Sequence, residues 1–338
     1  MKYGVFIGRF QPLHEGHARV IETAMQHCQK LIVLIGSAGS ARTLRNPWTW
    51  TERAQMIEAR FPEYAGKFIF KPLEDKTYRD QEWITQVQEI VNHTIDDEGW
   101  VDKREITLVG SAKDHTGYYL NLFPNWQSLP VDHKIPLNST EIRDALFGFA
   151  RHDLAAWMSD KVLAQIVEHQ NKQWYFDLRD EYAWVEKYKD QFKSLPYPPI
   201  FQTVDAAVIM SGHILLVERG KRPGKGKLAI PGGYLNANET IERATLRELR
   251  EETQIDASDT RIRAGFLKRQ LFDDVHRSAR GRVLTHASLF RLPAERNLPR
   301  VKGSDDAARA FWLPLSYLQQ HLMFEDHYHI IKTLVAGV

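Results

Sequence analysis

The chain has 338 residues, 43% hydrophobic and 26% charged, so its length indicates about two domains and its composition excludes a disordered protein. Its formal charge of +2 gives no overall basic field for nucleic acid, and no apolar run is long enough for a signal peptide or a membrane span. The single cysteine, Cys28, excludes an intrachain disulfide and a cysteine-based zinc site. We therefore expect a cytoplasmic protein.

The first elements predict a βαβ unit and hence a parallel sheet. An apolar run at residues 3–7 ends at Gly8, a loop rich in Gly, Pro and His follows, and a helical pattern starts at His17. A second apolar run, at residues 31–35, again ends in glycine. We predict further strands at 68–70 and 106–109 and helices at 50–60 and 81–91, with the first domain ending near residue 170.

Residues 171–200 combine Trp, Tyr and charged residues with three prolines, and predict a connecting helix followed by a proline-stiffened linker. Beyond it, apolar runs at 204–210 and 214–217 flank Ser211-Gly212-His213, which indicates a β-hairpin. A helix is predicted at about 239–252. The sequence thus predicts domains at 1–170 and 201–338, joined by a linker at 171–200.

The loop between the first strand and the first helix, GRFQPLHEGH, has the features of a phosphate site. Ligands bind at the carboxyl ends of parallel strands, and a helix N-terminus there offers free N–H groups and the positive end of a dipole. His14 and His17 are three residues apart and share one helix face, while Gly8 and Gly16 allow close backbone approach. The alternative is a loop with incidental histidines. No GxxxxGK[ST] motif is present, so a P-loop site is not supported.

This loop resembles the HxGH nucleotidyltransferase superfamily, whose second motif, (I)SSTxIR, is similar to residues 138–143, with Asn138 replacing the first serine. Within the superfamily, GRFQPLHEGH, Gly36-Ser37-Ala38 and the segment from Arg45 to Arg53 resemble archaeal-type nicotinamide mononucleotide (NMN) adenylyltransferases. The resemblance implies a Rossmann-like domain with a parallel sheet. It also implies catalytic roles for His14, His17 and Arg143, and ATP or phosphate binding by Gly8, Arg9, Phe10, Arg45, Ser139 and Thr140.

The same resemblance implies that Asp75 and Trp83 form the nicotinamide pocket, with Trp83 stacked on the ring. Trp83 is alternatively an ordinary core aromatic on an amphipathic helix, and Thr140 is alternatively a helix cap. In the implied reaction the NMN phosphate attacks the α-phosphorus of ATP and pyrophosphate leaves. The protein then has to align two anions and neutralise growing charge, a task shared with Mg²⁺ on the ATP phosphates.

Three glutamates on the helix predicted in the C-terminal half indicate a metal site. Glu248, Glu251 and Glu252 are spaced i, i+3 and i+4, so they project from one helix face and repel one another unless cations lie among them. All-oxygen ligands suit Mg²⁺ or Mn²⁺, which clamp a pyrophosphate and activate water. The alternative is a solvated acidic face.

The surrounding residues resemble the Nudix signature, G-x5-E-x7-R-E-U-x-E-E-x-G-U, matched from Gly233 to Ile255 with Gln254 replacing the last glycine. The resemblance implies an α/β/α sandwich with a mixed sheet, metal binding by the three glutamates and the Gly232 carbonyl, and a structural pair between Glu239 and Arg247.

Two later segments bear on the Nudix substrate. Residues 273–282 end in Arg277, Arg280 and Arg282 and resemble a segment of ADP-ribose-binding Nudix proteins, although an exposed basic loop is the alternative. In related enzymes an acidic residue from a loop like that at Asp305 and Asp306 assists the water or the metals.

These features predict a bifunctional enzyme that makes NAD from NMN and ATP and hydrolyses ADP-ribose to AMP and ribose 5-phosphate, with Mg²⁺ or Mn²⁺ at both sites. Its partners are then ATP, NMN, NAD and ADP-ribose, without nucleic acid or membrane. Homo-oligomerisation is left open. The alternatives are another acceptor (pantetheine, flavin or choline phosphate), another Nudix substrate, or a Nudix half that only senses ADP-ribose.

Overall fold

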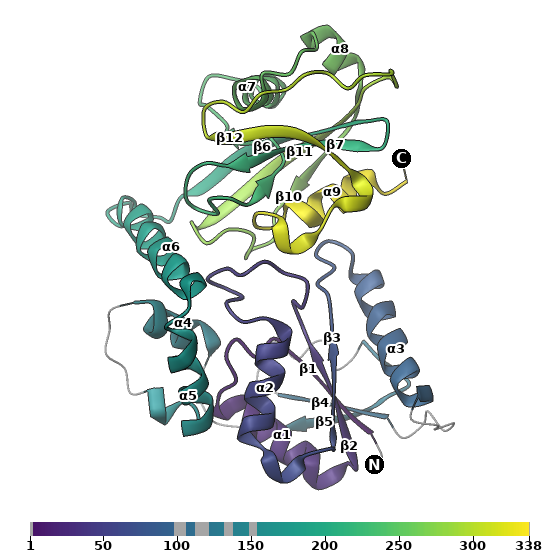
Figure 1. Ribbon diagram of the computed structural model, residues 1–338, viewed down its shortest axis with the longest axis vertical. Coiled ribbons are helices and arrows are strands. Elements are labelled where there is room, and N and C mark those ends of the chain that lie inside the picture. Colours follow the sequence, from purple (N-terminus) through teal and green to yellow (C-terminus); the bar gives the residue numbers. More distant parts are fainter. Residues whose placement is uncertain (1–2, 98–105, 112–121, 132–137, 149–153, 338) are drawn as a thin grey trace. The chain divides into compact units, whose positions relative to one another are not determined.

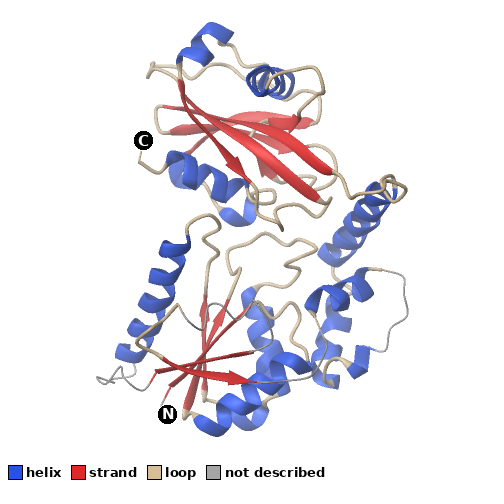
Figure 2. Cartoon of the chain, turned by 180° about the vertical axis from the view of Figure 1, so that it is seen from behind, coloured by secondary structure: helices blue, strands red, loops and turns tan. Residues whose placement is uncertain are grey.

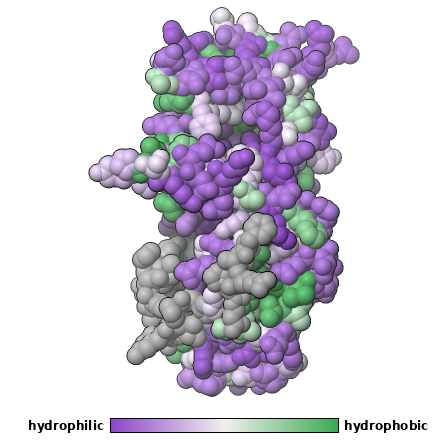
Figure 3. Space-filling model, turned by 90° about the vertical axis from the view of Figure 1, so that its left-hand side faces the viewer, coloured by the Kyte–Doolittle hydropathy of each residue, from purple (hydrophilic) through white to green (hydrophobic). Residues whose placement is uncertain are grey.

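A computed structural model describes residues 3–97, 106–111, 122–131, 138–148 and 154–337. The chain divides into two compact units, Met1–Asp180 and Glu181–Val338, which Figure 1 shows in purple to teal and in teal to yellow. Hydrophilic residues dominate the face drawn in Figure 3. Within the described ranges, no helix combines the length and the apolar character that a membrane span requires.

The first unit contains a parallel sheet with strand order β3-β2-β1-β4-β5. The apolar runs predicted as strands are strands. The bounds are Tyr3–Gly8 for β1, Lys30–Ile35 for β2, Phe68–Pro72 for β3, Ile106–Ser111 for β4 and Gln127–Val131 for β5. A helix follows each of β1, β2 and β3, which is the arrangement that the βαβ pattern predicted, and Figure 2 shows helices on both sides of the sheet.

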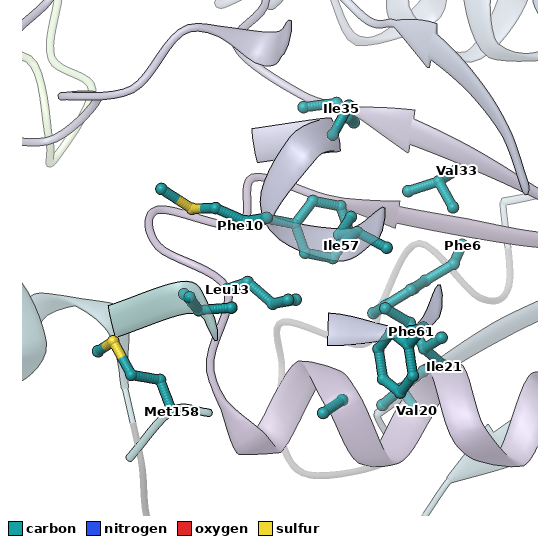
Figure 4. Packing of buried hydrophobic residues seen from close by; sticks show 14 of the residues in the cluster. Phe6, Phe10, Leu13, Val20, Ile21, Val33, Ile35, Ile57, Phe61 and Met158 are labelled. Atoms are coloured by element: carbon teal, nitrogen blue, oxygen red, sulfur yellow. The ribbon is translucent and has the colours of Figure 1, made fainter. Parts of the chain in front are cut away.

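Helices cover both faces of this sheet because consecutive strand residues point to opposite faces. Phe6 packs in a core with α1, α2, α4 and α5, whereas its neighbour Val5 packs on the other face against α3. Figure 4 shows the first of these cores, with Phe10 and Leu13 from the loop after β1 packed into it. The helices are Glu15–His27 (α1), Trp50–Arg60 (α2), Asp80–Asp97 (α3), Ser139–Phe147 (α4), Asp160–His169 (α5) and Gln173–Asp190 (α6), whose residues divide between the two units, with 3₁₀ helices at Pro62–Tyr64 (η1) and Leu154–Ala156 (η4).

The second unit is a mixed sheet between helices, as the sequence predicted. The strand order is β10-β11-β6-β7-β12, with β8 on β7 and β9 on β6, and the β11–β6 pair is parallel while the other pairs are antiparallel. The strands are Ile200–Met210 (β6), His213–Arg219 (β7), Leu228–Ala229 (β8), Gly232–Tyr234 (β9), Phe266–Phe272 (β10), Arg282–Arg291 (β11) and Ala307–Pro314 (β12).

The helix with the glutamates, α7 (Ile241–Thr253), packs with α8 (Asp259–Ala264) on one face of this sheet, and α9 (His327–Val335) lies on the other (Figure 1). The predicted hairpin is present, because β6 and β7 meet at Ser211-Gly212. Short 3₁₀ helices lie at Leu315–Tyr317 (η5) and Gln320–Leu322 (η6). The α/β/α sandwich is thereby confirmed.

Candidate active sites

Two imidazoles meet at the N-terminus of α1. His14 caps the helix, and its Nδ1 accepts a hydrogen bond from the backbone N–H of Gly16 at 3.1 Å. The His17 ring lies beside it, with 3.8 Å between the ring centroids. Because Nδ1 of His14 is an acceptor, we infer that the neutral ring carries its proton on Nε2, where it can donate to a phosphate.

Phe10 packs against one member of this histidine pair, His17. Its backbone is left-handed, with φ at 50°, and its buried ring contacts the His17 ring edge-on at 5.0 Å. A Cβ atom added to Gly8 would lie 2.7 Å from the Phe10 ring. The space beside Gly8, which the sequence predicted for a ligand, is therefore filled by Phe10, and glycine is required there for packing.

Three arginines place buried positive charge around the same loop. Arg9 has a buried Nη1 atom with no hydrogen-bond partner in the described part of the chain, and burial lowers the pKa of its guanidinium. Arg53 is 0% exposed and donates to the carbonyls of Arg9 and Gly36, both at 2.6 Å. Burial lowers the pKa of Arg53 and of Arg143 to about 10. Like charges held together without water favour an anionic ligand.

The second motif begins α4 and supplies the third of these arginines. Arg143 donates through Nη1 to the Gln11 carbonyl at 2.8 Å and through Nη2 to Thr140 Oγ1 at 3.1 Å. The interpretation of Thr140 as the helix cap is wrong. The helix begins at Ser139, and Asn138 is its cap, with Oδ1 accepting from the N–H of Glu141 at 2.9 Å. Thr140 instead orients Arg143.

The loop that carries Arg45 is fastened to the histidine loop. The Gln11 side chain donates to the Trp48 carbonyl at 2.9 Å and accepts from the Trp48 N–H at 3.1 Å. Arg42 makes a bidentate pair with Glu52 at 2.8 and 2.9 Å, and Glu52 also completes the capping box of α2. Arg45 is partly buried, and its charge contributes to the lowered pKa of Arg143.

The two residues predicted for the nicotinamide pocket, Asp75 and Trp83, have different surroundings. Asp75 follows β3, and its negative charge acts on the guanidinium groups of Arg9 and Arg53. Trp83 lies in the first turn of α3, partly buried, with 6.4 Å between its ring centroid and that of Phe123. The charge of Asp75 thus acts on the buried arginines, while the contacts of the partly buried Trp83 are those of a residue at the edge of the core.

In the C-terminal unit, Arg247 holds the glutamates of α7. Its guanidinium pairs with Glu239 at 2.7 and 3.0 Å, as the sequence predicted, and its Nη1 also contacts Glu248 and Glu251, both at 2.8 Å. The hydrogen bonds from Arg247, with one from the Asn236 N–H at 2.9 Å, lower the pKa of Glu239 to about 2. A further bond from Arg247 to the Tyr234 carbonyl, at 3.1 Å, fixes β9 to the helix.

Glu252 and Glu248 are the buried members of the acidic set. Oε2 of Glu252 accepts from the Gly232 N–H at 3.0 Å, and burial, with Glu248 beside it, raises the pKa of Glu252 to about 8. Burial also raises the pKa of Glu248, whereas Glu251 is exposed. A Cβ atom on Gly233 would lie 2.5 Å from the Glu248 carboxylate, so glycine there lets the strand approach the acids.

Two of the three arginines in the predicted basic loop, Arg277 and Arg280, have largely buried side chains. Arg277 is buried and makes a bidentate pair with Asp326, both bonds at 3.0 Å. Arg280 is mostly buried and lies 3.4 Å from Glu325. Arg282 is more exposed and donates to the Asp273 carbonyl. The sequence did not reveal these acidic partners, because they come from the chain's far end.

The loop with Asp305 and Asp306 lies against the end of α7. The Ser304 N–H donates to the Glu252 carbonyl at 3.2 Å, and Asp305 has φ at 55°. The charge of Asp305 helps to raise the pKa of Glu248, while Asp306 pairs with Lys221. Of these two acids, Asp305 is the one whose charge acts on Glu248. Sequence reasoning missed Arg219, which ends β7 near the glutamates; its only signal was an arginine at the end of an apolar strand.

Two family models match the chain, one for each unit. Residues 5–145 match a model described as cytidylyltransferase-like, and residues 201–334 match the NUDIX domain. A nicotinamide/nicotinic acid mononucleotide adenylyltransferase of Acinetobacter baylyi is 37% identical over 147 residues, which cover 43% of this chain and 75% of that protein. A nicotinamide-nucleotide adenylyltransferase of Halobacterium salinarum is 42% identical over 88 residues, 26% of this chain and about half (49%) of that protein.

Solved structures match the whole chain. A bifunctional NMN adenylyltransferase/ADP ribose pyrophosphatase from Francisella tularensis is 34% identical, with a TM-score of 0.91 and coverage of 99% of both chains. The same protein complexed with AMP and a manganese ion has the same identity and TM-score and covers 99% of this chain and 98% of that one.

Proposed function

Because this chain belongs to the family of bifunctional NMN adenylyltransferase/ADP-ribose pyrophosphatases, we propose that it forms NAD and pyrophosphate from NMN and ATP in its first unit, and AMP and ribose 5-phosphate from ADP-ribose in its second. The resemblance on which the sequence prediction rested is confirmed. Another acceptor for the nucleotidyltransferase is not favoured. We also propose that the domains span residues 1–170 and 201–338. The proposed location is the cytoplasm.

The adenylyl transfer is supported above all by the buried, unpaired donor of Arg9, which belongs to the same loop as the histidine pair. His14 donates from Nε2, and His17 lies next to it, so both imidazoles meet the phosphates at the positive end of α1. Arg9, Arg45 and Arg143 offset the charge that grows on the leaving pyrophosphate. Gly8, Phe10, Ser139 and Thr140 shape this site, and no protein nucleophile is required.

Trp83→Ala tests the acceptor site in the full chain with NMN, ATP and Mg²⁺. We expect the KM for NMN to rise on the order of 10-fold while the KM for ATP stays nearly constant, since base–aromatic stacking contributes ~1–3 kcal/mol. Trp83→Phe keeps a stacking ring and serves as the control. Equal rises in both KM values would assign Trp83 to the core. Failure of the unaltered chain to make NAD would overturn the whole proposal for this unit.

The hydrolysis is supported by the acidic cluster on α7 at the glycine pair of β9. Glu248, Glu251, Glu252 and the Gly232 carbonyl would hold Mg²⁺ or Mn²⁺, since hard cations take oxygen ligands. Within the described residues no group of acids is already spaced for a metal, and Arg247 engages Glu248 and Glu251. The residues fit the ion nevertheless, because two buried acids with raised pKa values need a cation to ionise.

Such an ion, when bound, activates water and screens the diphosphate. Arg247 and Glu239 keep β9 and α7 in register for this, and Asp305 is the residue that we assign to assist from its loop. Arg277, Arg280 and Arg282 were predicted to bind ADP-ribose, and of these Arg280 lies nearest the site, through Tyr234.

Glu252→Gln separates hydrolysis from sensing. We expect ADP-ribose hydrolysis to fall by at least a hundredfold while ADP-ribose still binds, as for a group that acts mainly in the transition state. Glu242→Gln, on the exposed face of the same helix, is the matched control and keeps full activity. If the unaltered chain binds ADP-ribose but never hydrolyses it with Mg²⁺ or Mn²⁺, the unit is a sensor and the proposal fails.

A further inference from the structure

The arginines first predicted for ADP-ribose are largely committed to protein partners. Arg277 gives its Nε and Nη2 atoms to the buried Asp326 carboxylate. Arg280 donates to Ser278 Oγ at 3.1 Å, to Tyr234 Oη at 3.3 Å and to Glu325 at 3.4 Å. A diphosphate would have to displace these partners. Besides the proposed metal ion, a side-chain cation without such partners would suit the diphosphate.

Arg219 is a cation of the same unit that is not committed in this way. Its Nε donates to the Pro223 carbonyl at 2.8 Å. Its two terminal nitrogens make no hydrogen bond or ion pair with any residue that the structure describes, and neither is sealed away from the surroundings. This partly buried guanidinium thus keeps both Nη groups, a planar fork of donors, without a partner among the described residues.

The guanidinium of Arg219 lies over the ring of Phe324. Its Cζ atom lies 4.2 Å from the centroid of the Phe324 ring, which is only 5% exposed. The Cζ atom of Arg280 lies 5.9 Å from the same centroid. Two guanidinium groups therefore share one phenyl ring, and burial together with Arg280 lowers the pKa of Arg219. An anion bound between them would relieve this repulsion.

Backbone pairing places this arrangement at the glutamate site. The Arg219 N–H donates to the Lys227 carbonyl at 2.9 Å, at the start of β8, and the chain then runs through β8 to Gly232, which Glu252 contacts. Arg280 reaches Tyr234, two residues beyond Gly232. The charges of Glu252 and Glu325 act on Arg219 as well. The Arg219 guanidinium thus lies close enough to the proposed metal ligands for the charge of Glu252 to act on it.

We propose that Arg219 binds the diphosphate of ADP-ribose through its two Nη groups, with its guanidinium over the Phe324 ring and backed by the charge of Arg280. The role rests on the proposed hydrolase function of this unit. The ligand class is a nucleoside diphosphate joined to a sugar, because a planar fork matches two phosphate oxygens at once. Arg219 is a binding residue here and takes no part in activating water.

Steady-state hydrolysis of ADP-ribose by the full chain with Mg²⁺ tests this role. We expect Arg219→Met to raise the KM on the order of 10- to 100-fold, with kcat changed less than about threefold, as for loss of a charged hydrogen bond made equally in ground and transition states. Arg219→Lys keeps the charge and loses the fork, so its KM lies between the two.

Arg309→Met is the matched control. Arg309 lies on β12 opposite Glu218, the residue before Arg219, and forms an ion pair with Glu218 at 2.6 Å. Its Cζ atom lies 4.9 Å from the centroid of the Phe311 ring, but its side chain is 66% exposed. Its loss removes the same kind of stacking and leaves the KM for ADP-ribose within about twofold. Thermal unfolding of each variant reports whether the second unit is folded; if Arg219→Met is not, Arg219→Lys decides.

The outcomes separate the two claims. If the unaltered chain does not hydrolyse ADP-ribose, the proposed function fails. If the unaltered chain hydrolyses ADP-ribose, and both Arg219 variants have the same KM for ADP-ribose as the unaltered chain or lower kcat alone, the assignment of Arg219 is overturned. A rise in KM for Arg219→Met, a smaller rise for Arg219→Lys and none for Arg309→Met support it.

Discussion

Gln254, at the C-terminus of α7, is an L-residue in a position that the Nudix signature gives to glycine. Its backbone is left-handed, with φ 42° and ψ 37°, and its N–H donates to the Arg250 carbonyl at 3.0 Å. The exposed side chain makes no hydrogen bond within the described residues. Gln254→Gly therefore removes a strained Cβ and no contact.

The expected gain is the difference between two opposing terms. A left-handed L-residue costs roughly 1–2 kcal/mol, and glycine costs about 0.5–1 kcal/mol in unfolded-state entropy. The net stabilisation is about 0.5–1 kcal/mol. For a unit of the size of Glu181–Val338, each kcal/mol shifts the Tm by about 2–4 °C, so we expect a rise of about 1–4 °C. Gln254→Ala keeps the Cβ and is the control without gain.

Calorimetry of the full chain measures this shift, and the transition of the second unit is the one that Asp326→Asn lowers. ADP-ribose hydrolysis should remain within about twofold of the unaltered chain, because every glutamate of α7 keeps its place. A lowered Tm for Gln254→Gly, or an equal gain for Gln254→Ala, would refute the explanation by backbone strain.

Three further changes test the burial of charge. Arg53→Met removes the donor to the carbonyls of Arg9 and Gly36 and should lower the unfolding free energy of the first unit by roughly 2–5 kcal/mol in urea; a loss below about 1 kcal/mol contradicts this. Asp326→Asn strands the buried cation of Arg277 and should cost the second unit about 3–5 kcal/mol, whereas an unchanged Tm would contradict the buried pair. Burial lowers the pKa of His169, so the unfolded state binds its proton more readily. Stability that is present above about pH 6.5 should be lost as the pH falls below that value, and a Tm that is equally pH-dependent in His169→Gln would assign the effect to another group.

Features that depend on local spacing could be predicted from the sequence. The predicted helix at 50–60 coincides with α2, which starts at the Thr49–Glu52 capping box. The spacing of Glu248, Glu251 and Glu252 placed them on one helix, because i, i+3 and i+4 residues share a face in any α-helix. The pairing of Glu239 with Arg247 followed from the resemblance to a known signature.

Features that depend on contacts distant in sequence could not be predicted. Arg277 and Asp326 are 49 residues apart, and neither position signals the other, so the sequence predicted a ligand-binding arginine, with an exposed loop as the alternative, and gave no sign of a buried ion pair. The cap of α4 was misplaced because Asn138, Ser139 and Thr140 are all residues that favour caps, and only the backbone shows where the helix begins. The filling of the space at Gly8 by Phe10 likewise required the fold.

The buried guanidinium groups of Arg9, Arg53 and Arg143 also bear on how long the chain lasts in a cell. An empty site leaves these cations facing one another, so the fold is weakest when nucleotide is scarce. A nucleotide at a hundred times its Kd adds about 2.7 kcal/mol to the stability of the form that binds it. Proteases that remove unfolded chains would then degrade this enzyme fastest when its substrates run out. The concentration of nucleotide would therefore set the amount of enzyme in the cell as well as the rate of its reaction.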